Sequence, residues 1–310
     1  METTDTAGAI SLREILRAHA RWIEMQSRGQ SSDGRCILDG ATLNGMNLTD
    51  ADLRGAILRG ATFLDAELTA AKLGQAVIDA ADFQRALLGA ADFSEARITE
   101  SNFDGSWMAG GILADAEVRH SSFAKANLRE ARLQGAKFES CKFTAATLIA
   151  SSFHHARIQL CDFADANLSD AQFVRARMEQ ARFYAAQGPD ANFSNSQLKN
   201  CDFSRADLAR ARFPQADLTA SQMDRTRLQE ADFRGTQLSG VALCRADLSA
   251  ARFQGAELMA TDLRGADLTR ARELTAKQLM QARTDESTIL PNGSRGPFLR
   301  HSGAERPQNS

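Results

Sequence analysis

The sequence predicts an all-β fold: a four-sided β-solenoid that is closed by a short helix at each end. Three observations lead to this prediction. A five-residue period runs from Cys36 to Ala271, phenylalanines fall in two columns at 20-residue spacing, and a helix-like segment flanks the repeat on each side. A period of five fits neither the 3.6 residues of a helical turn nor the two of a strand, so the backbone must turn after every five residues.

The two inward positions of the repeat are strongly constrained. From Leu38 to Leu268 every fifth residue gives 47 positions, and 46 of them are Leu, Phe, Ile, Met or Val. Two residues before each lies a small residue, which is Ala, Ser, Thr, Cys or Gly in 45 of the 47 cases. The one large-position exception is Gly188, followed by Pro189. Because the count of five continues past it, we expect the rod to go on there with a local bulge or bend.

Phenylalanine sets the number of sides. Eight lie at 20-residue spacing from Phe63 to Phe203, and seven occupy the column ten residues away, from Phe93 to Phe253. Within the repeat only Phe138 lies elsewhere. A 20-residue coil has four five-residue sides, so Phe lines two opposite walls and smaller aliphatic residues line the other two. The 47 repeats make nearly twelve coils, about 56 Å long at roughly 4.8 Å between stacked strands.

The repeat unit itself has a recognisable form. Segments such as Ala51-Asp52-Leu53-Arg54-Gly55 follow the pattern A(D/N)LXX, which resembles the pentapeptide-repeat family. That resemblance implies a right-handed quadrilateral β-helix, here of about 12 coils, in agreement with the columns of Phe. The helical segments on both sides of the repeat are similar to the flanks of bacterial pentapeptide-repeat proteins.

The ends of a solenoid expose strand edges and need covers. Ser11-Leu12-Arg13-Glu14 is typical of a capping box that opens an amphipathic helix, and Thr275 to Gln278 repeats this pattern before a short apolar segment. Such helical caps argue mildly against an end-to-end dimer, and both a monomer and a dimer remain open. We expect a flexible N-terminus at residues 1–10 and a capping helix with a turn at 11–35. The solenoid follows at 36–271, a helix with a short strand as cap at 272–293, and a disordered tail at 294–310.

We predict no catalytic, cofactor-binding or metal-binding residues, and therefore no enzyme. Cys141 and Cys161 occupy the small inward position one coil apart, where a thiol fills space. His154 and His155 form the only His pair, and zinc needs three or four convergent ligands. The sequence has no Gly-rich phosphate loop, and a filled rod lacks a cleft in which carboxylates could act.

Possible partner contacts are Trp107, Leu87 and Tyr184. By register Trp107 points outward one coil above Leu87, which also faces out, and such a pair is a plausible anchor for a protein partner. The alternative is that glycines around Trp107 distort the coil and let the indole fold onto the rod. Tyr184 lies just before the break at Gly188.

The function that best fits these features is a non-enzymatic, rod-like protein-interaction scaffold of unknown partner. The net charge of −2 argues against direct nucleic-acid binding, and we expect no membrane span. The five cysteines lack close pairing, which predicts a cytoplasmic location. The alternative, implied by the resemblance, is a DNA-mimicking modulator of gyrase, a type II topoisomerase. Residues 36–110 hold 11 acidic and 5 basic residues, so the excess of acid in the repeat is confined to its first third.

Overall fold

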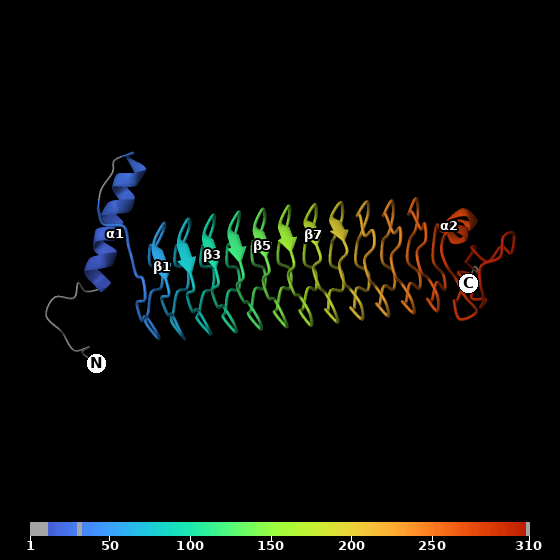
Figure 1. Cartoon of the computed structure of the whole chain (residues 1–310), viewed down its shortest axis with the longest axis horizontal. Helices are drawn as coiled ribbons and strands as arrows, with labels where there is room; N and C mark the ends of the chain where they lie inside the picture. Colours follow the sequence, from blue (N-terminus) through green and yellow to red (C-terminus); the bar gives the residue numbers. More distant parts are fainter. Residues whose placement is uncertain (1–11, 30–32, 308–310) are drawn as a thin grey trace.

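The computed structural model describes residues 12–29 and 33–307 and shows a parallel β-solenoid that forms a long rod, with a short helix at each end (Figure 1). Eight strands form one sheet in chain order, each parallel to the next at a step of 20 residues. The elements are α1 (Leu12–Ser27), β1 (Ile57–Arg59), β2 (Val77–Asp79), β3 (Arg97–Thr99), β4 (Glu117–Arg119), β5 (Lys137–Glu139), β6 (Arg157–Gln159), β7 (Arg177–Glu179), β8 (Gln197–Lys199) and α2 (Ala276–Gln281).

The other sides of the rod are joined by single bridges with the same step of 20. In the first coil Ile37, Thr42, Asn47 and Asp52 each pair with the residue 20 positions further on. These bridges lie five residues apart, so each coil has four sides, as the columns of Phe predicted. The sheet β1–β8 covers seven turns, and the bridges carry the repeat beyond it at both ends, as far as Arg272.

Each corner of the coil is a tight turn whose geometry explains the five-residue period. Every fifth residue has a positive φ, for example 66° at Gly40 and 58° at Asp50. At most corners the next N–H then donates to the carbonyl three residues back, as Ala41 does to Leu38 at 3.0 Å. At the corners that follow the strands β1–β8 a side chain can accept instead, as Ser101 Oγ does from the Ala81 N–H. A positive φ at the third residue is the mark of a type II turn. The small inward residue follows directly, where the chain bends toward the axis.

The interior consists of stacked side chains in columns, as the sequence predicted. Phe63 and Phe83 stack with ring centroids 4.5 Å apart, and Phe93 meets Phe103 edge to face at 5.9 Å. Small polar residues bond along their own column: Ser101 Oγ accepts from the Ala81 N–H at 3.1 Å. The centre is therefore filled with side chains that repeat from coil to coil.

The structure contains no bulge or bend at Gly188. Gln187 keeps its bridges to Asn167 and Asp207, so the coil passes this point in register. A Cβ at Gly188 would lie 3.1 Å from Leu208 Cδ2 and 3.5 Å from Leu168 Cβ. The expected distortion is thus wrong, because the neighbouring leucines close the space and the backbone bonds do not need a side chain there.

At the N-terminal end α1 lies across the first coil (Figure 1). Leu12, Ile15 and Leu16 pack against the core, and His19 is completely buried. The predicted capping box begins at Ser11, which lies outside the described residues.

At the C-terminal end Thr275 and Gln278 form the predicted capping box of α2. Gln278 Nε2 also donates to the carbonyls of Phe253 and Ala256, at 2.8 and 2.9 Å, and so covers the open edge of the last coils. In the described parts of the chain neither helix has the length and apolar character needed to cross a membrane.

Residues 294–307 differ from the expected disordered tail. Ile289 pairs with Arg295 in an antiparallel bridge, and the Phe298 N–H donates to Thr284 Oγ1 at 2.9 Å. Phe298 packs against the core and Ala304 is buried. The prediction of disorder from residue 294 needs this correction, because apolar side chains anchor the segment on the last coils.

Candidate interaction surface

Trp107 and Leu87 lie next to each other on one wall of the rod, as their register predicted. They form a parallel bridge, and the Leu88 N–H donates to the Trp107 carbonyl at 2.7 Å. The coil is regular, because the Gly111 N–H donates to Met108 at 2.9 Å as in other corners. The indole of Trp107 lies beside Gly89: a Cβ atom built on Gly89 would be 3.8 Å from Trp107 Cδ1. Trp107 is nevertheless 54% exposed, and Leu87 is 44% exposed. The alternative of a distorted coil that hides the indole is therefore wrong.

Beyond Glu67, which bridges to Leu87, this wall carries no ionised side chain up to Arg129. We define the Trp107 surface as the outward residues of this wall between Glu67 and Asn127. The next ionised side chains on the wall are Glu67 on one side, and Arg129 with Glu130, which form an ion pair at 3.2 Å, on the other. Its residues are Thr69, Ala70, Leu87, Gly89, Ala90, Trp107, Ala109 and Gly110.

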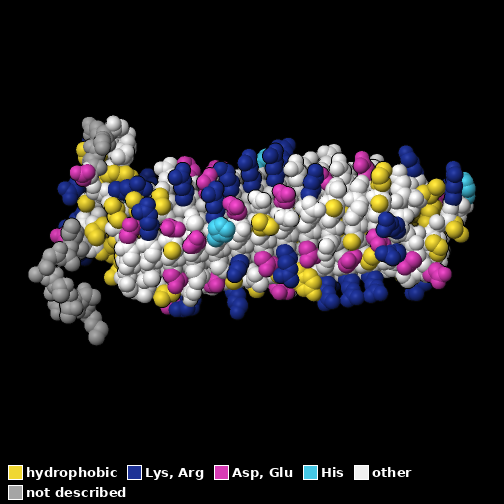
Figure 2. Space-filling model, in the orientation of Figure 1, with side chains coloured by type: hydrophobic (Ala, Val, Ile, Leu, Met, Phe, Trp, Pro, Cys, Tyr) yellow, Lys and Arg dark blue, Asp and Glu magenta, His cyan; other side chains and the backbone are white. Residues whose placement is uncertain are grey.

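Elsewhere on the walls several ion pairs join successive coils. Cations and carboxylates 20 residues apart meet, as Arg85 does with Asp65 at 2.7 Å. Exposed pairs of this kind add little stability, but they leave the surface mixed in charge, with basic and acidic side chains interspersed along the rod (Figure 2). Other examples are Lys137–Glu117, Arg119–Glu139, Arg210–Asp190 and Arg227–Asp207.

Tyr184 is not brought to the Trp107 surface. It lies three residues before Gln187, which is four bridges along the rod from Trp107, or about 19 Å at the spacing of stacked strands. Arg182 and Arg205 lie over its ring, with guanidinium carbons 5.1 and 5.7 Å from the centroid. Tyr184 thus contributes to a separate, basic part of the surface.

The cysteines and surface histidines do not gather into a metal-binding group within the described residues. Four of the five cysteines are buried, and all five are free. Burial raises the pKa of Cys36 to about 11 and that of Cys201 to about 12, so both thiols stay protonated. In the described part of the chain, no three His, Cys, Asp or Glu residues gather in a way that could hold a metal ion.

One residue that sequence reasoning missed is His19. Its Nδ1 accepts the Cys36 N–H at 3.0 Å, which joins α1 to the first coil, and its ring stacks on Trp22. Burial lowers the pKa of His19 below its usual value. A lone His on an amphipathic helix gives no sign of this contact, since the partner lies across a loop.

A second missed feature is the pair Arg157 and Arg177, which are direct partners in the register of β6 and β7. The sequence contains a signal for this pair, because the two arginines lie at the same position of successive 20-residue coils.

Comparison with known proteins agrees with this architecture. A family model described as pentapeptide repeats matches residues 36–75, 76–114, 112–149 and 236–272, and one described as a pentapeptide repeat region matches residues 136–213. Together the matches cover more than half of the chain. No curated protein matches the sequence.

Several solved structures are similar. HetL from the cyanobacterium Nostoc, described as involved in heterocyst differentiation regulation, is 23% identical; the match covers 93% of this chain and 100% of HetL, with a TM-score of 0.24. QnrB1, a plasmid-mediated fluoroquinolone resistance protein, is 18% identical over 55% of this chain and 85% of its own, with a TM-score of 0.24. A thylakoid-lumen protein of Arabidopsis thaliana is 20% identical over 45% and 83%, with a TM-score of 0.26.

At these identities and TM-scores the solved structures carry no argument about this chain. The family is established by the repeat itself, which the family models recognise over most of the rod and which the 20-residue bridges reproduce in space. The chain belongs to the pentapeptide-repeat family.

Proposed function

We propose that this protein is a non-catalytic scaffold: a right-handed, four-sided rod of about twelve coils that binds a protein partner through the Trp107 surface. The observation that carries the proposal is the exposed Trp107 stacked on exposed Leu87 within an uncharged part of the wall. Tryptophan is among the residues that most often dominate the binding energy of interfaces. An exposed apolar surface bordered by charged residues is typical of a contact site.

The rigidity of the rod supports this role. Each coil is bonded to the coils on both sides, so the Trp107 surface keeps its shape when a partner binds. A preorganised surface loses little conformational entropy on association, which favours affinity. The free cysteines are compatible with work in the cytoplasm, where thiols stay reduced.

No observation favours the gyrase alternative. A mimic of duplex DNA needs carboxylates in continuous rows, like phosphates. Along these walls carboxylates meet cations in the next coil, and the face in Figure 2 is mixed in charge. The likeness to QnrB1 extends to the fold alone.

The scaffold proposal is tested by photo-crosslinking in cells. A photoreactive amino acid at Ala109, inside the Trp107 surface, should capture a defined partner, and one at Met259 in another wall should not capture it. With the purified partner, Trp107→Ala should weaken binding by about 30-fold, which corresponds to a loss of ~2 kcal/mol.

The matched control is Met259→Ala, which removes an exposed apolar side chain from a different wall. Met259→Ala should bind like the wild type. Equal capture from both positions, or unchanged affinity of Trp107→Ala, would overturn the assignment of this surface.

A further inference from the structure

Arg157 and Arg177 are two like charges next to each other on the wall of β1–β8. They face each other in the register of β6 and β7, and both are exposed. Among the described residues neither has an ion pair, whereas Arg119 and Lys137 on the same wall meet Glu139 and Glu117 in an adjacent coil. Lys137, one coil before, is bound to Glu117 at 2.7 Å, and the residue after Arg177 in this column is the neutral Gln197. Like charges directly opposite each other are destabilising, so an anion bound between the two guanidinium groups would reduce their repulsion.

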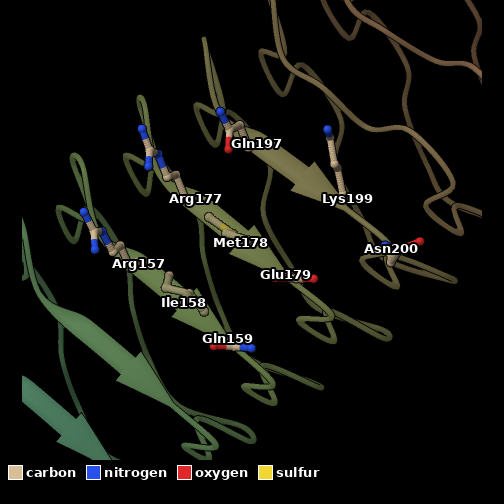
Figure 3. Close-up of a pocket in the computed structure, with 9 residues that line it drawn as sticks. All are labelled: Arg157, Ile158, Gln159, Arg177, Met178, Glu179, Gln197, Lys199 and Asn200. Atoms are coloured by element: carbon tan, nitrogen blue, oxygen red, sulfur yellow. The ribbon is translucent and has the colours of Figure 1, made fainter.

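The two arginines form one side of a shallow groove of about 360 Å³ on the β6–β8 wall. Figure 3 shows their side chains side by side and pointing the same way, with Gln197 in line. Ile158 and Met178, whose side chains are buried, mark its floor. The opposite side is formed by Gln159, Glu179, Lys199 and Asn200.

An exposed leucine stands beside this groove. Leu160 follows Gln159 at the corner of the coil, has a φ of 54° and is 51% exposed. The other corner residues of the solenoid, at every fifth position from Gly40 to Arg270, are glycine, alanine or polar residues. A bulky side chain is disfavoured at a positive φ, and an exposed leucine adds nothing to the core. Leu160 is therefore a second, independent departure from the repeat at the same place.

We propose that this groove, which we call the Arg157 groove, binds an acidic segment of another protein. A carboxylate of that segment bridges Arg157 and Arg177, and an aliphatic or aromatic side chain of the same segment packs on Leu160. Two guanidinium groups can hold one carboxylate by charge-assisted hydrogen bonds. Arg157 and Leu160 are three residues apart, about 10 Å along an extended chain, which sets the spacing between the acidic and the apolar group.

The chemistry of the groove favours a protein segment over a nucleic acid. Glu179 lies within it and repels a continuous row of phosphates. The arginine pair spans only one coil spacing, which suits a single anionic group, and Leu160 offers a contact that a sugar–phosphate backbone does not use. The Arg157 groove and the Trp107 surface lie ten residues apart in the 20-residue coil, on opposite walls, so this inference does not depend on the function proposed above.

The test selects random-sequence peptides, displayed on phage, for binding to the full chain. We expect enrichment of peptides that combine Asp or Glu with Leu, Ile or Phe. The double variant Arg157→Gln with Arg177→Gln should weaken the best peptide at least on the order of tenfold, measured by fluorescence anisotropy. Leu160→Ala should weaken it less, because the ion pair remains.

The matched control is the double variant Arg225→Gln with Arg245→Gln. These arginines also stand in successive coils, are exposed, and have no ion pair with a described residue, so the control removes the same charge from another edge. The control should bind the peptide like the wild type. Equal losses in both double variants would show a nonspecific charge effect and overturn the proposal.

Two further results would also overturn it. One is selection of peptides without acidic residues. The other is displacement of the peptide from the Arg157 groove by a single-stranded oligonucleotide at lower concentration than by the unlabelled peptide, which would assign the groove to nucleic acid. Inorganic phosphate should compete only weakly, because it lacks the apolar contact with Leu160.

Discussion

The interior of the rod and its outer walls are built from the same coils but follow different rules. Inside, one coil resembles the next: stacked Phe rings are 4.5 to 5.4 Å apart along both columns. Outside, the coils differ in the charge that they carry, and two places on opposite walls show this. The Trp107 surface has no charge, and the Arg157 groove has two like charges in register. The difference suggests that the repeated interior holds the fold while the walls carry the function, and the two can be separated by mutation.

The largest expected effect is a loss of stability from the interior. Phe143 stacks between Phe123 and Phe163, at 5.0 and 4.8 Å. Phe143→Ala should lower the free energy of unfolding by about 3–5 kcal/mol, because it leaves a cavity in a column that cannot close. The measurement is urea unfolding followed by circular dichroism. The neighbouring outward residue serves as control: Lys142→Ala should change the free energy by less than about 0.5 kcal/mol. Similar losses for both variants would contradict the separation of interior and walls.

The next effect concerns the N-terminal end, where the interior meets α1. Burial holds the pKa of His19 below its usual value of 6.5, with Asp52 and the backbone of Arg54 opposing this shift and the charge of Arg35 adding to it. The neutral ring is therefore favoured in the folded state. Its stabilising contribution is complete above pH 6.5 and is lost as the pH falls below it, since the protonated Nδ1 cannot accept the Cys36 N–H. Acid should release α1 while the coils stay folded.

Trp22 reports on this step, because it stacks on His19 and the chain has two tryptophans in all. In a Trp107→Phe background the fluorescence of Trp22 should change between pH 7 and pH 5, and circular dichroism of the solenoid should not. His19→Gln should abolish the change, since the other four histidines remain. A persistent transition in His19→Gln would assign the titration to another group.

The smallest expected effect is on the wall of β6 and β7. Arg177→Glu replaces the like pair with an ion pair to Arg157 and should raise the free energy of unfolding by about 0.2–1 kcal/mol. The same change should abolish peptide binding in the Arg157 groove. Arg177→Gln, which removes the repulsion without adding an attraction, should lie between the wild type and Arg177→Glu in unfolding experiments. A less stable Arg177→Glu would mean that the two arginines do not repel each other.

Much of the fold could be predicted from the repeat, because columns of similar side chains that stack on one another reveal the 20 residues of each coil. The Phe columns predicted the four sides, and the outward positions of Leu87 and Trp107 followed from register. The prediction of a bulge or bend at Gly188 failed, because it was based on this one residue. The backbone bonds between coils continue there, and neighbouring leucines fill the space of the missing side chain. The tail failed for the opposite reason, because Phe298 finds its apolar surface only on the assembled last coils.

The sequence by itself determined the interior of this protein, since a five-residue period with a large and a small inward residue is a local pattern that every coil repeats. The tertiary structure decided how separate segments meet. It places His19 on the Cys36 backbone, leaves Tyr184 far from Trp107, and brings Arg177 next to Arg157 of the preceding coil. Such contacts join residues distant in the chain, and whether a charge finds a partner depends on the residue one coil away.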